Sequence, residues 1–240
     1  MKTGNGTDKK QRERAVVCLS GGMDSCVTAA LAAREYETYG IHFSYGQRTE
    51  TREFESARAV AHELGMRDMM NLRIDIFRRI GGSALTDSAI DVPRSVADAP
   101  LDGSPKHAIP VTYVPFRNAH FLSAAVSWAE VIGAKKVFIG AVEQDSSGYP
   151  DCRPAYYDAF NKLIETGTKD GDIRIVTPLI AMKKAEIIRA GLELKAPFHV
   201  TWSCYSSDVA ACGVCDSCVL RLRAFSQAGF TDPIPYQVTR

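Results

Sequence analysis

The sequence predicts an α/β protein with a doubly wound parallel sheet and a small zinc-binding segment at its C-terminal end. Three observations lead to this prediction. Apolar runs of strand length alternate with stretches of helical spacing, which is typical of strands joined by right-handed helical crossovers. A loop rich in serine and glycine follows the first apolar run. Four of the 7 cysteines lie close together near the end of the sequence, at spacings typical of a metal site.

The order of elements is predicted from local patterns. The run at residues 15–19 is continuously apolar, as in a strand buried on both faces, and helical spacing begins at Met23. Helices are also predicted at residues 51–64 and 118–132. Residues 81–110 contain four prolines and three glycines and are interpreted as a long, mobile, lid-like excursion. The remaining strands are expected at residues 38–43, 69–74, 111–114, 136–142 and 173–177.

The composition favours a compact enzyme with a small-molecule substrate. Of the 240 residues, 45% are hydrophobic, which is enough for one substantial core. Lys and Arg number 29 against 28 Asp and Glu, which gives a net charge of +1, so we expect no nucleic-acid partner. The sequence has no apolar run of about 18 residues, as a membrane helix would need. We therefore expect a cytoplasmic protein without a membrane partner.

The loop after the first strand is predicted to bind an anion. Gly21 and Gly22 lack Cβ atoms and allow close approach, while the first amides and the dipole of the following helix attract negative charge. Ser20 and Ser25 add hydroxyl donors, and no Lys follows the glycines as it would in a Walker loop. The expected cofactor-binding residues are Cys18, Leu19, Ser20, Gly21, Gly22, Met23, Asp24 and Ser25.

The clustered cysteines predict a metal centre. Cys212, Cys215 and Cys218 form two C-x-x-C steps, and Cys204 adds a fourth thiol. Four thiolates fill a tetrahedral coordination sphere, so the expected zinc ion is structural and pins the C-terminal segment to the main domain. A pair of disulfides is disfavoured in a cytosolic chain, whereas an iron–sulfur cluster stays open as an alternative.

These features divide the chain into three parts. Residues 1–13 are polar and basic, which is typical neither of a signal peptide nor of a membrane anchor, and we expect them to form a disordered tail. Residues 14–200 are predicted to form a nucleotide-binding α/β domain, and residues 201–240 a zinc-binding C-terminal segment.

Several motifs together resemble a known enzyme family. The first loop resembles the pyrophosphate loop, Ser-Gly-Gly-x-Asp-Ser, of the N-type ATP pyrophosphatases. The whole set is similar to the 7-cyano-7-deazaguanine synthase family of queuosine biosynthesis, over residues from about 15 to 230. The further motifs that carry the resemblance are Ser44-Tyr45-Gly46-Gln47-Arg48, Val114-Pro115-Phe116-Arg117-Asn118, the run from Asp145 to Arg153, Thr201-Trp202-Ser203-Cys204-Tyr205 and the four cysteines.

The resemblance implies a ligase that forms C–N bonds, on a Rossmann-like fold of the adenine nucleotide alpha hydrolase type. The implied reaction is the ATP-dependent conversion of 7-carboxy-7-deazaguanine and free ammonia into 7-cyano-7-deazaguanine. AMP is transferred to the carboxylate oxygen, ammonia then forms an amide, and a second activation permits elimination to the nitrile. The implied cofactors are ATP, Mg²⁺ and Zn²⁺, and the implied assembly is a homodimer.

The same resemblance suggests which residues act. Asp24 is expected to hold the helix turn or to ligate a magnesium ion carried by ATP. Basic residues are candidates for neutralising phosphate or carboxylate charge, with solvated surface charge as the alternative. The predicted catalytic residues are Ser20, Asp24, Ser25, Arg48, Arg117 and Lys183, and the predicted substrate-binding residues are Gln47, Tyr149, Asp151 and Arg153.

The loop around residues 149–153 is expected to recognise the deazapurine. Tyr149 would stack on the base, Asp151 would accept its N–H groups, and Arg153 would meet the carboxylate. The alternative is a proline-fixed turn with a solvated ion pair. Cys152 is interpreted as a small buried hydrophobic residue in preference to a nucleophile.

Two positions depart from the family pattern. Many members have Gly where Phe116 stands here, and many have His where Thr49 follows Arg48. Neither departure removes a group that the implied reaction requires.

Other functions stay open from the sequence. A tRNA-thiolating enzyme also combines the Ser-Gly-Gly-x-Asp-Ser loop with C-x-x-C pairs, but it would need an RNA-binding surface and cysteines near the loop. A relative that stops at the amide is a second alternative. A nucleotide-binding regulatory domain without catalysis is a third, and the intact loop residues argue against it.

Overall fold

The computed structural model describes residues 12–94, 109–143 and 149–237. Its five-stranded sheet has the order β3-β2-β1-β4-β5, and every neighbouring pair of strands is parallel. The strands are β1 (Arg14–Cys18), β2 (Glu37–Ser44), β3 (Asp68–Arg73), β4 (Lys136–Ile139) and β5 (Arg174–Val176).

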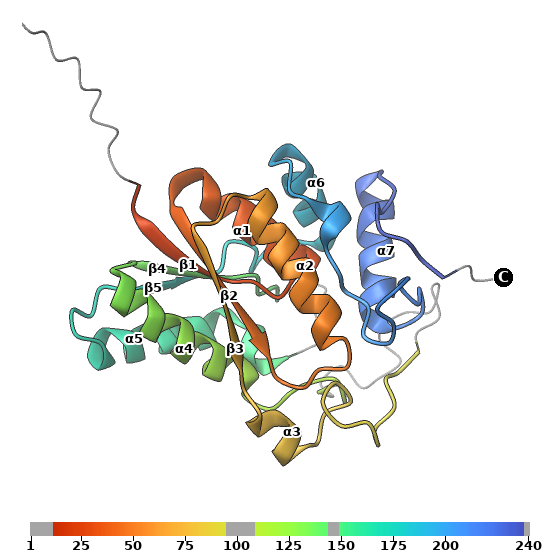
Figure 1. Ribbon diagram of the computed structural model, residues 1–240, viewed down its shortest axis with the longest axis horizontal. Helices are drawn as coiled ribbons and strands as arrows, with labels where there is room; N and C mark the ends of the chain where they lie inside the picture. The colour runs from red at the N-terminus through yellow and green to blue at the C-terminus, as the bar shows by residue number, and fades with distance from the viewer. Residues whose placement is uncertain (1–11, 95–108, 144–148, 238–240) are drawn as a thin grey trace, which may run out of the picture.

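Helices cover both faces of this sheet (Figure 1). One face carries α1 (Met23–Glu35), α2 (Glu50–Glu63), α6 (Lys184–Glu193) and α7 (Asp216–Ala228), which share one apolar cluster. The other face carries α4 (Arg117–Ile132), α5 (Pro154–Gly167) and the short α3 (Ile76–Ile80), which contribute to a second cluster. The predicted doubly wound parallel sheet is thus confirmed, as are the helices expected at residues 51–64 and 118–132.

Strand β1 lies at the centre because it is apolar on both faces. Val17 belongs to the cluster on the α1 side and Val16 to the cluster on the α4 side, and both are 0% exposed. Burial of each side chain of this kind stabilises the fold by about 1.5–3 kcal/mol. The central position of β1 directs its carboxyl end, and the loop that follows, to the middle of the sheet edge where ligands of such folds bind.

The strand predicted at residues 111–114 is wrong. These residues form a turn, in which the amide of Tyr113 donates to the carbonyl of Pro110 at 2.9 Å. Pro110 and Pro115 bound the run, and proline has no N–H to donate to a strand ladder. Val114 still packs into the core on the α4 side, while β4 takes the place beside β1.

The loop between β1 and α1 packs so closely against α2 and the end of β4 that two positions of this contact have no room for a Cβ atom. Gly21 has a φ of +86°, and a Cβ there would collide with the carbonyl oxygen of Glu53. A Cβ at Gly140, just beyond β4, would lie 2.9 Å from the amide nitrogen of Ser25. Glycine at both positions therefore lets α2 and β4 hold the loop against the sheet.

The C-terminal segment is fixed by a buried ion pair. Arg221 on α7 is 1% exposed and donates from Nε to Asp232 at 2.7 Å and from Nη1 to Thr201 Oγ1 at 2.8 Å. The neighbouring amide of Trp202 donates to the carbonyl of Gly21 at 2.9 Å. This chain of contacts connects the end of the sequence to its first loop.

Some predicted features fall partly outside the described residues. These are residues 1–11 of the predicted tail, residues 95–108 of the predicted lid-like excursion, and residues 144–148 before the substrate loop. Residues 81–94 are described, and Arg94 makes a β-bridge with Cys215. Among the described residues, every helix is too short or too polar to cross a membrane.

Replacing Gly140 with Ala is expected to lower the free energy of unfolding by about 1–3 kcal/mol, because the added Cβ would displace the backbone of the loop. Thermal unfolding followed by circular dichroism would measure the change. Gly167→Ala in α5 is the control, since a Cβ there meets no atom within 4 Å. Equal melting temperatures for the two variants would contradict this account of the loop.

Candidate active site

The loop that opens α1 presents a set of donors at the carboxyl end of β1. The hydroxyl of Ser20 accepts from the amide of Gly22 at 3.2 Å and donates to Ser25 Oγ at 3.0 Å. Ser25 Oγ in turn donates to the carbonyl of Gly22 at 2.9 Å. These bonds hold the turn open at the helix N-terminus, where amides and dipole favour an anion.

Asp24 lies in the first turn of α1 and is paired across the sheet edge with a lysine. Lys184 Nζ, at the start of α6, lies 2.7 Å from Asp24 Oδ2. The other carboxylate oxygen, Asp24 Oδ1, is buried without a partner among the described residues. That oxygen is the kind of hard ligand that a magnesium ion takes, so the residues fit a nucleotide-bound magnesium ion.

The structure gives different positions to two neighbouring lysines that the sequence alone could not distinguish. Lys183 is exposed and forms the N-terminal cap of α6, whereas Lys184 lines the central pocket. Of the two lysines, Lys184 is the one that lines the pocket, and the role of Lys183 in phosphate binding stays a prediction. Lys183 is the extended residue that precedes α6 and Lys184 is the first helical residue, and no short-range signal in the sequence distinguishes the two.

A pocket of about 310 Å³ opens at this edge of the sheet, at the small end of the roughly 300–1,000 Å³ range of ligand sites. The loop between β1 and α1 forms part of its wall, together with residues from β2, α2, α4, α6 and the C-terminal segment. Of the predicted site residues, those that line it are Cys18, Leu19, Ser20, Gly22, Met23, Asp24, Ser25, Gln47, Arg48, Arg117 and Tyr149.

Arg117 enters the pocket from the first turn of α4. Its Nη1 donates to Tyr45 Oη at 3.0 Å, and its guanidinium lies 5.6 Å from the centre of the Phe121 ring. Burial opposes the charge, but Tyr45, Tyr149 and Asp151 raise the pKa of Arg117 above its ordinary value. Its Nε is buried without a partner in the described chain, so a donor remains for a bound anion.

Arg48 has a different position. Its Nε donates to the carbonyl of Ala84 at 2.8 Å, and its Nη2 to the carbonyls of Asp87 and Ile90 at 3.2 and 2.6 Å. The side chain thus fastens the segment that follows α3 to the pocket rim. This segment carries the start of the predicted lid-like excursion.

The predicted substrate loop divides into three positions. Tyr149 lines the pocket, and its hydroxyl lies 2.8 Å from Thr112 Oγ1. Asp151 is 4% exposed and accepts from the amide of Asn118 at 3.3 Å, so it braces the start of α4. Arg153 is exposed at the N-terminal end of α5. Tyr149 alone of these three lines the pocket.

Cys152 also lines the pocket. Burial, followed by the nearby charge of Asp151, raises the pKa of its thiol to about 11. The thiolate is the nucleophilic form of cysteine, so this environment agrees with the interpretation of Cys152 as a small apolar residue.

Glu53 on α2 is a pocket residue that the sequence analysis missed. Its carboxylate accepts from Thr49 Oγ1 at 2.8 Å and from Gln47 Nε2 at 3.2 Å. Burial raises its pKa to about 7, although hydrogen bonds from Thr49 and Gln47 oppose the shift. The signal in the sequence was an acidic residue one turn into a helix that follows a motif loop.

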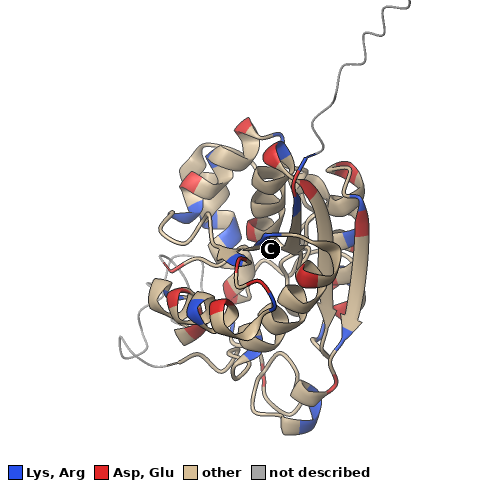
Figure 2. Cartoon of the chain, turned by 90° about the vertical axis from the view of Figure 1, so that its left-hand side faces the viewer, with Lys and Arg blue, Asp and Glu red and all other residues tan. Residues whose placement is uncertain are grey.

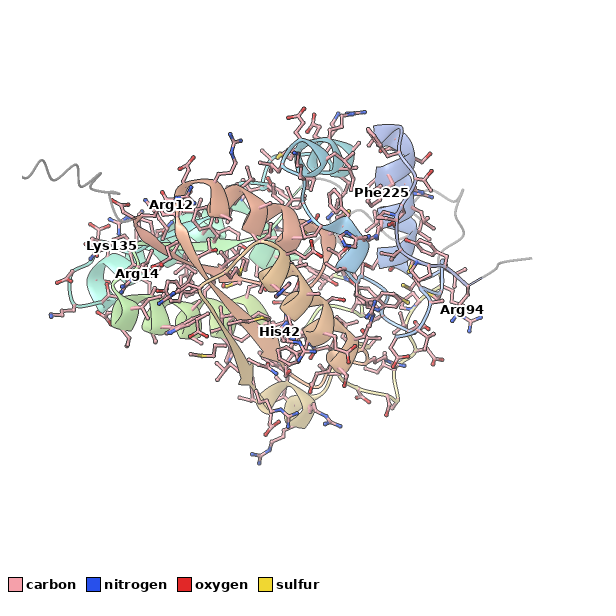
Figure 3. The ribbon with its side chains drawn as sticks, turned by 45° about the horizontal axis from the view of Figure 1, so that its top comes forward. Arg12, Arg14, His42, Arg94, Lys135 and Phe225 are labelled. Atoms are coloured by element: carbon pink, nitrogen blue, oxygen red, sulfur yellow. The ribbon has the colours of Figure 1, made fainter. Side chains whose placement is uncertain are left out.

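His42 on β2 is a second missed residue, and Figure 3 labels it beside α2, where its ring lies 5.4 Å from that of Phe54. Its Nδ1 lies 2.9 Å from the carbonyl of Leu19, and its Nε2 is buried without a partner among the described residues. Burial lowers the pKa of the ring, so Nδ1 carries the hydrogen and Nε2 is an acceptor on the pocket wall.

The four clustered cysteines form a compact, buried group of ligands. Their sulfur atoms all lie within 4.8 Å of one another, and Cys212 Sγ lies 3.9 Å from Cys218 Sγ. A tetrahedral zinc ion with bonds of about 2.3 Å would separate the sulfurs by about 3.8 Å. The amides of Cys212 and Cys215 donate to neighbouring sulfurs at 3.3 Å, which favours thiolates. None of the cysteines forms a disulfide, so this cluster fits a single metal ion.

The fold and this loop define a class: a doubly wound α/β domain whose serine- and glycine-rich turn opens the first helix at the carboxyl end of the central strand. The model of the family "Queuosine biosynthesis protein QueC" matches residues 14–229. The chain belongs to the QueC family.

Named relatives are close in sequence over nearly the whole chain. A 7-cyano-7-deazaguanine synthase of Acidobacterium capsulatum is 70% identical over 226 residues, which cover 94% of this chain and 97% of the relative. One from Koribacter versatilis is 62% identical, with 93% of each chain covered. A solved structure of NMN synthetase from Francisella tularensis is 16% identical, has a TM-score of 0.45, and is matched over 80% of this chain and 65% of its own.

Replacing Cys212 with Ser is expected to abolish tight metal binding, because a hydroxyl is a poor ligand for a thiolate site. Elemental analysis of the purified protein would give about one metal ion per wild-type chain and much less in the variant, and would identify the metal. Cys152→Ser is the control, since Cys152 lies outside the cluster. Full metal content in Cys212→Ser would contradict the assignment.

Proposed function

We propose that this chain converts 7-carboxy-7-deazaguanine and ammonia into 7-cyano-7-deazaguanine, with ATP as the activating substrate, in queuosine biosynthesis. The observation that carries the proposal is the match of the whole α/β domain and the cysteine cluster to the QueC family. The residues that line the pocket fit the chemistry that the proposal requires.

The chemical problem is that a carboxylate oxygen is a poor leaving group. Transfer of AMP to that oxygen releases pyrophosphate and gives a carbon that ammonia can attack, with AMP as the leaving group. The amide that forms is activated in the same way on its oxygen. The C–O bond to AMP then breaks, both amide N–H protons are lost to the solvent, and the nitrile remains. Orientation and neutralisation of phosphate charge are the main contributions of the protein.

The residues divide between the two ends of the pocket. We assign the leaving pyrophosphate to the amides and hydroxyls of Ser20 to Ser25, with Lys184 as the nearby cation. Asp24, through its unpartnered oxygen, would hold a magnesium ion that accompanies ATP. At the other end, Arg117 and Tyr149 are assigned to the carboxylate and the base of the substrate. We assign Arg48 to holding the segment after α3 at the rim of the pocket.

We assign zinc to the four cysteines as a structural ion, because four thiolates leave no open coordination position. Residues 14–200 would form the nucleotide-binding domain and residues 201–240 the zinc-binding segment. A cytoplasmic location suits four reduced thiols, and we propose a homodimer by analogy with the family. Figure 2 shows basic and acidic residues interspersed along the ribbon, a pattern that suits a small-molecule substrate better than a phosphate backbone.

The proposal is tested by the products. Purified protein incubated with ATP, magnesium, ammonium and 7-carboxy-7-deazaguanine is expected to yield the 7-cyano base and AMP, as identified by mass spectrometry. Omission of each component in turn provides the controls. Accumulation of the amide without nitrile would indicate a relative that stops earlier, and no turnover by metal-loaded protein would contradict the assigned substrate.

Replacing Lys184 with Met is expected to lower the rate of AMP formation by about 100-fold, because a phosphate-facing cation is lost from the pocket. Lys183→Met is the matched control on the adjacent, exposed position and should retain wild-type activity. Initial rates of AMP release from the two variants make the comparison. If Lys183→Met were the more damaged variant, phosphate binding would return to Lys183.

A further inference from the structure

The proposed reaction has a requirement that none of the assigned residues meets. The nucleophile is ammonia, but near neutral pH most of it is present as ammonium, which has no lone pair. A group in the pocket must therefore hold the cation and remove one proton before attack. This inference rests on the proposed function, and it concerns the step between the two activations.

The described residues that line the pocket include three carboxylates, those of Asp24, Glu53 and Asp216. Asp216 begins α7 directly after the metal ligand Cys215, and Glu53 is the carboxylate placed for this task. It lines the central pocket from the first turn of α2, beside the loop between β1 and α1. The carboxylate of Asp24, also in the pocket, is already paired with Lys184 at 2.7 Å, and Asp151 braces α4 behind the pocket wall.

Gln47 fixes the orientation of this carboxylate and uses both of its N–H donors. Its Nε2 donates to the carbonyl of Phe43 and to Glu53 Oε2, each at 3.2 Å, while its Oε1 accepts from the amide of Tyr45 at 2.8 Å. Donation from Gln47 to the substrate would break one of the two Nε2 bonds. The geometry makes Gln47 a positioning residue, in place of the substrate contact predicted from the sequence.

Thr49 provides a place for the proton that ammonium gives up. Thr49 Oγ1 lies 2.8 Å from Glu53 Oε1 and 3.1 Å from the carbonyl of Cys204. A hydroxyl has one hydrogen and cannot donate to both acceptors. When Glu53 carries a proton, Glu53 donates to Thr49 and Thr49 donates to Cys204, so both bonds are made. The protonated form of Glu53 is thus stabilised by an existing chain of hydrogen bonds.

The charges around Glu53 leave both of its forms accessible. Burial is the largest effect on its pKa and raises it to about 7, close to the pH at which a biosynthetic base would act. Arg117, from α4, lowers the pKa, and Glu50, on the same helix, raises it. Tyr45, from the loop after β2, is held neutral because burial raises its pKa to about 12.

We propose that Glu53 is the catalytic residue that binds ammonium and removes a proton from it, with Gln47 and Thr49 as positioning residues. The N–H bond of ammonium breaks, its electron pair stays on nitrogen, and the proton moves to Glu53 Oε1. The nitrogen lone pair forms the C–N bond to the adenylated carbon. The C–O bond to AMP then breaks and its electron pair leaves with AMP. A second proton lost from nitrogen to the solvent gives the neutral amide.

The test compares two substrates in the same variant. Glu53→Gln has the same size but accepts no proton. With 7-carboxy-7-deazaguanine and ammonium at about pH 7, its rate of amide formation is expected to fall by about 100-fold. With the 7-carboxamide as substrate, the ammonia step is bypassed, and nitrile formation should stay within about threefold of wild type. The deficit in the first assay should shrink at about pH 9, where more free ammonia is available.

Glu55→Gln is the matched control, because Glu55 lies on the same helix, is exposed, and forms a surface pair with Arg52 at 3.8 Å. Equal losses with both substrates, or no loss with either, would overturn the role of Glu53. Should Glu53→Gln melt early, Glu53→Asp retains the charge while displacing it by one methylene, and it should show the same selective loss. Failure of the wild-type protein on both substrates would instead overturn the proposed function.

Discussion

The structure depends on holding a short run of backbone amides in place at the carboxyl end of the central strand. Those amides, between Ser20 and Ser25, can stabilise an anion only when they are rigid. The serine hydroxyls supply the internal bonds of the turn. Three other parts of the chain, at Gly140, at Glu53 and at Trp202, then press against it with backbone atoms. The loop is fixed by its neighbours more than by its own sequence.

The same constraint explains why a cysteine cluster near the end of the sequence matters to the first loop. Cys204 lies two residues after Trp202, whose amide bonds the carbonyl of Gly21. The carbonyl of Cys204 also accepts from Thr49, the partner of Glu53. A metal ion that fixes Cys204 therefore fixes two walls of the pocket. The metal would act on catalysis through position, without a coordination site for substrate.

The fold and the grouping of the four cysteines followed from the sequence because they depend on local patterns. A strand that is apolar on both faces, such as residues 15–19, has few placements in an α/β fold. Glycines in the loop allow close approach of an anion, and the cysteine spacing is typical of a metal site, so each pattern has a direct physical explanation. The strand predicted at 111–114 was wrong because the prediction considered only its apolar composition. A strand in a sheet also needs amide donors, and Pro110 and Pro115 provide none at the two ends of this run.

The remaining differences come from tertiary packing. Lys183 and Lys184 are the same residue type in adjacent positions, and the path of the chain into α6 places Lys184 in the pocket wall. Asp151 belongs to a motif but faces Asn118, because the start of α4 needs an acceptor. Phe116 adopts a φ of 55°, a left-handed conformation that favours glycine, at the position where many family members have Gly. A short window of sequence shows neither the directions in which these side chains point nor the burial of Glu53.

The charge distribution of the pocket suits a reaction in which one carbon is activated twice. Asp24, Lys184 and the amides of the first loop lie at one end of the pocket. Arg117, which lies over the rings of Tyr45 and Phe121, is at the other end. A base that remained ionised throughout would attract Arg117 and compete with the substrate carboxylate. A carboxyl whose pKa is raised by burial avoids this competition, since it can be neutral while the acid binds and charged while ammonium is held. Burial of Glu53 therefore allows one small pocket to accept an anionic substrate and a cationic nucleophile in turn.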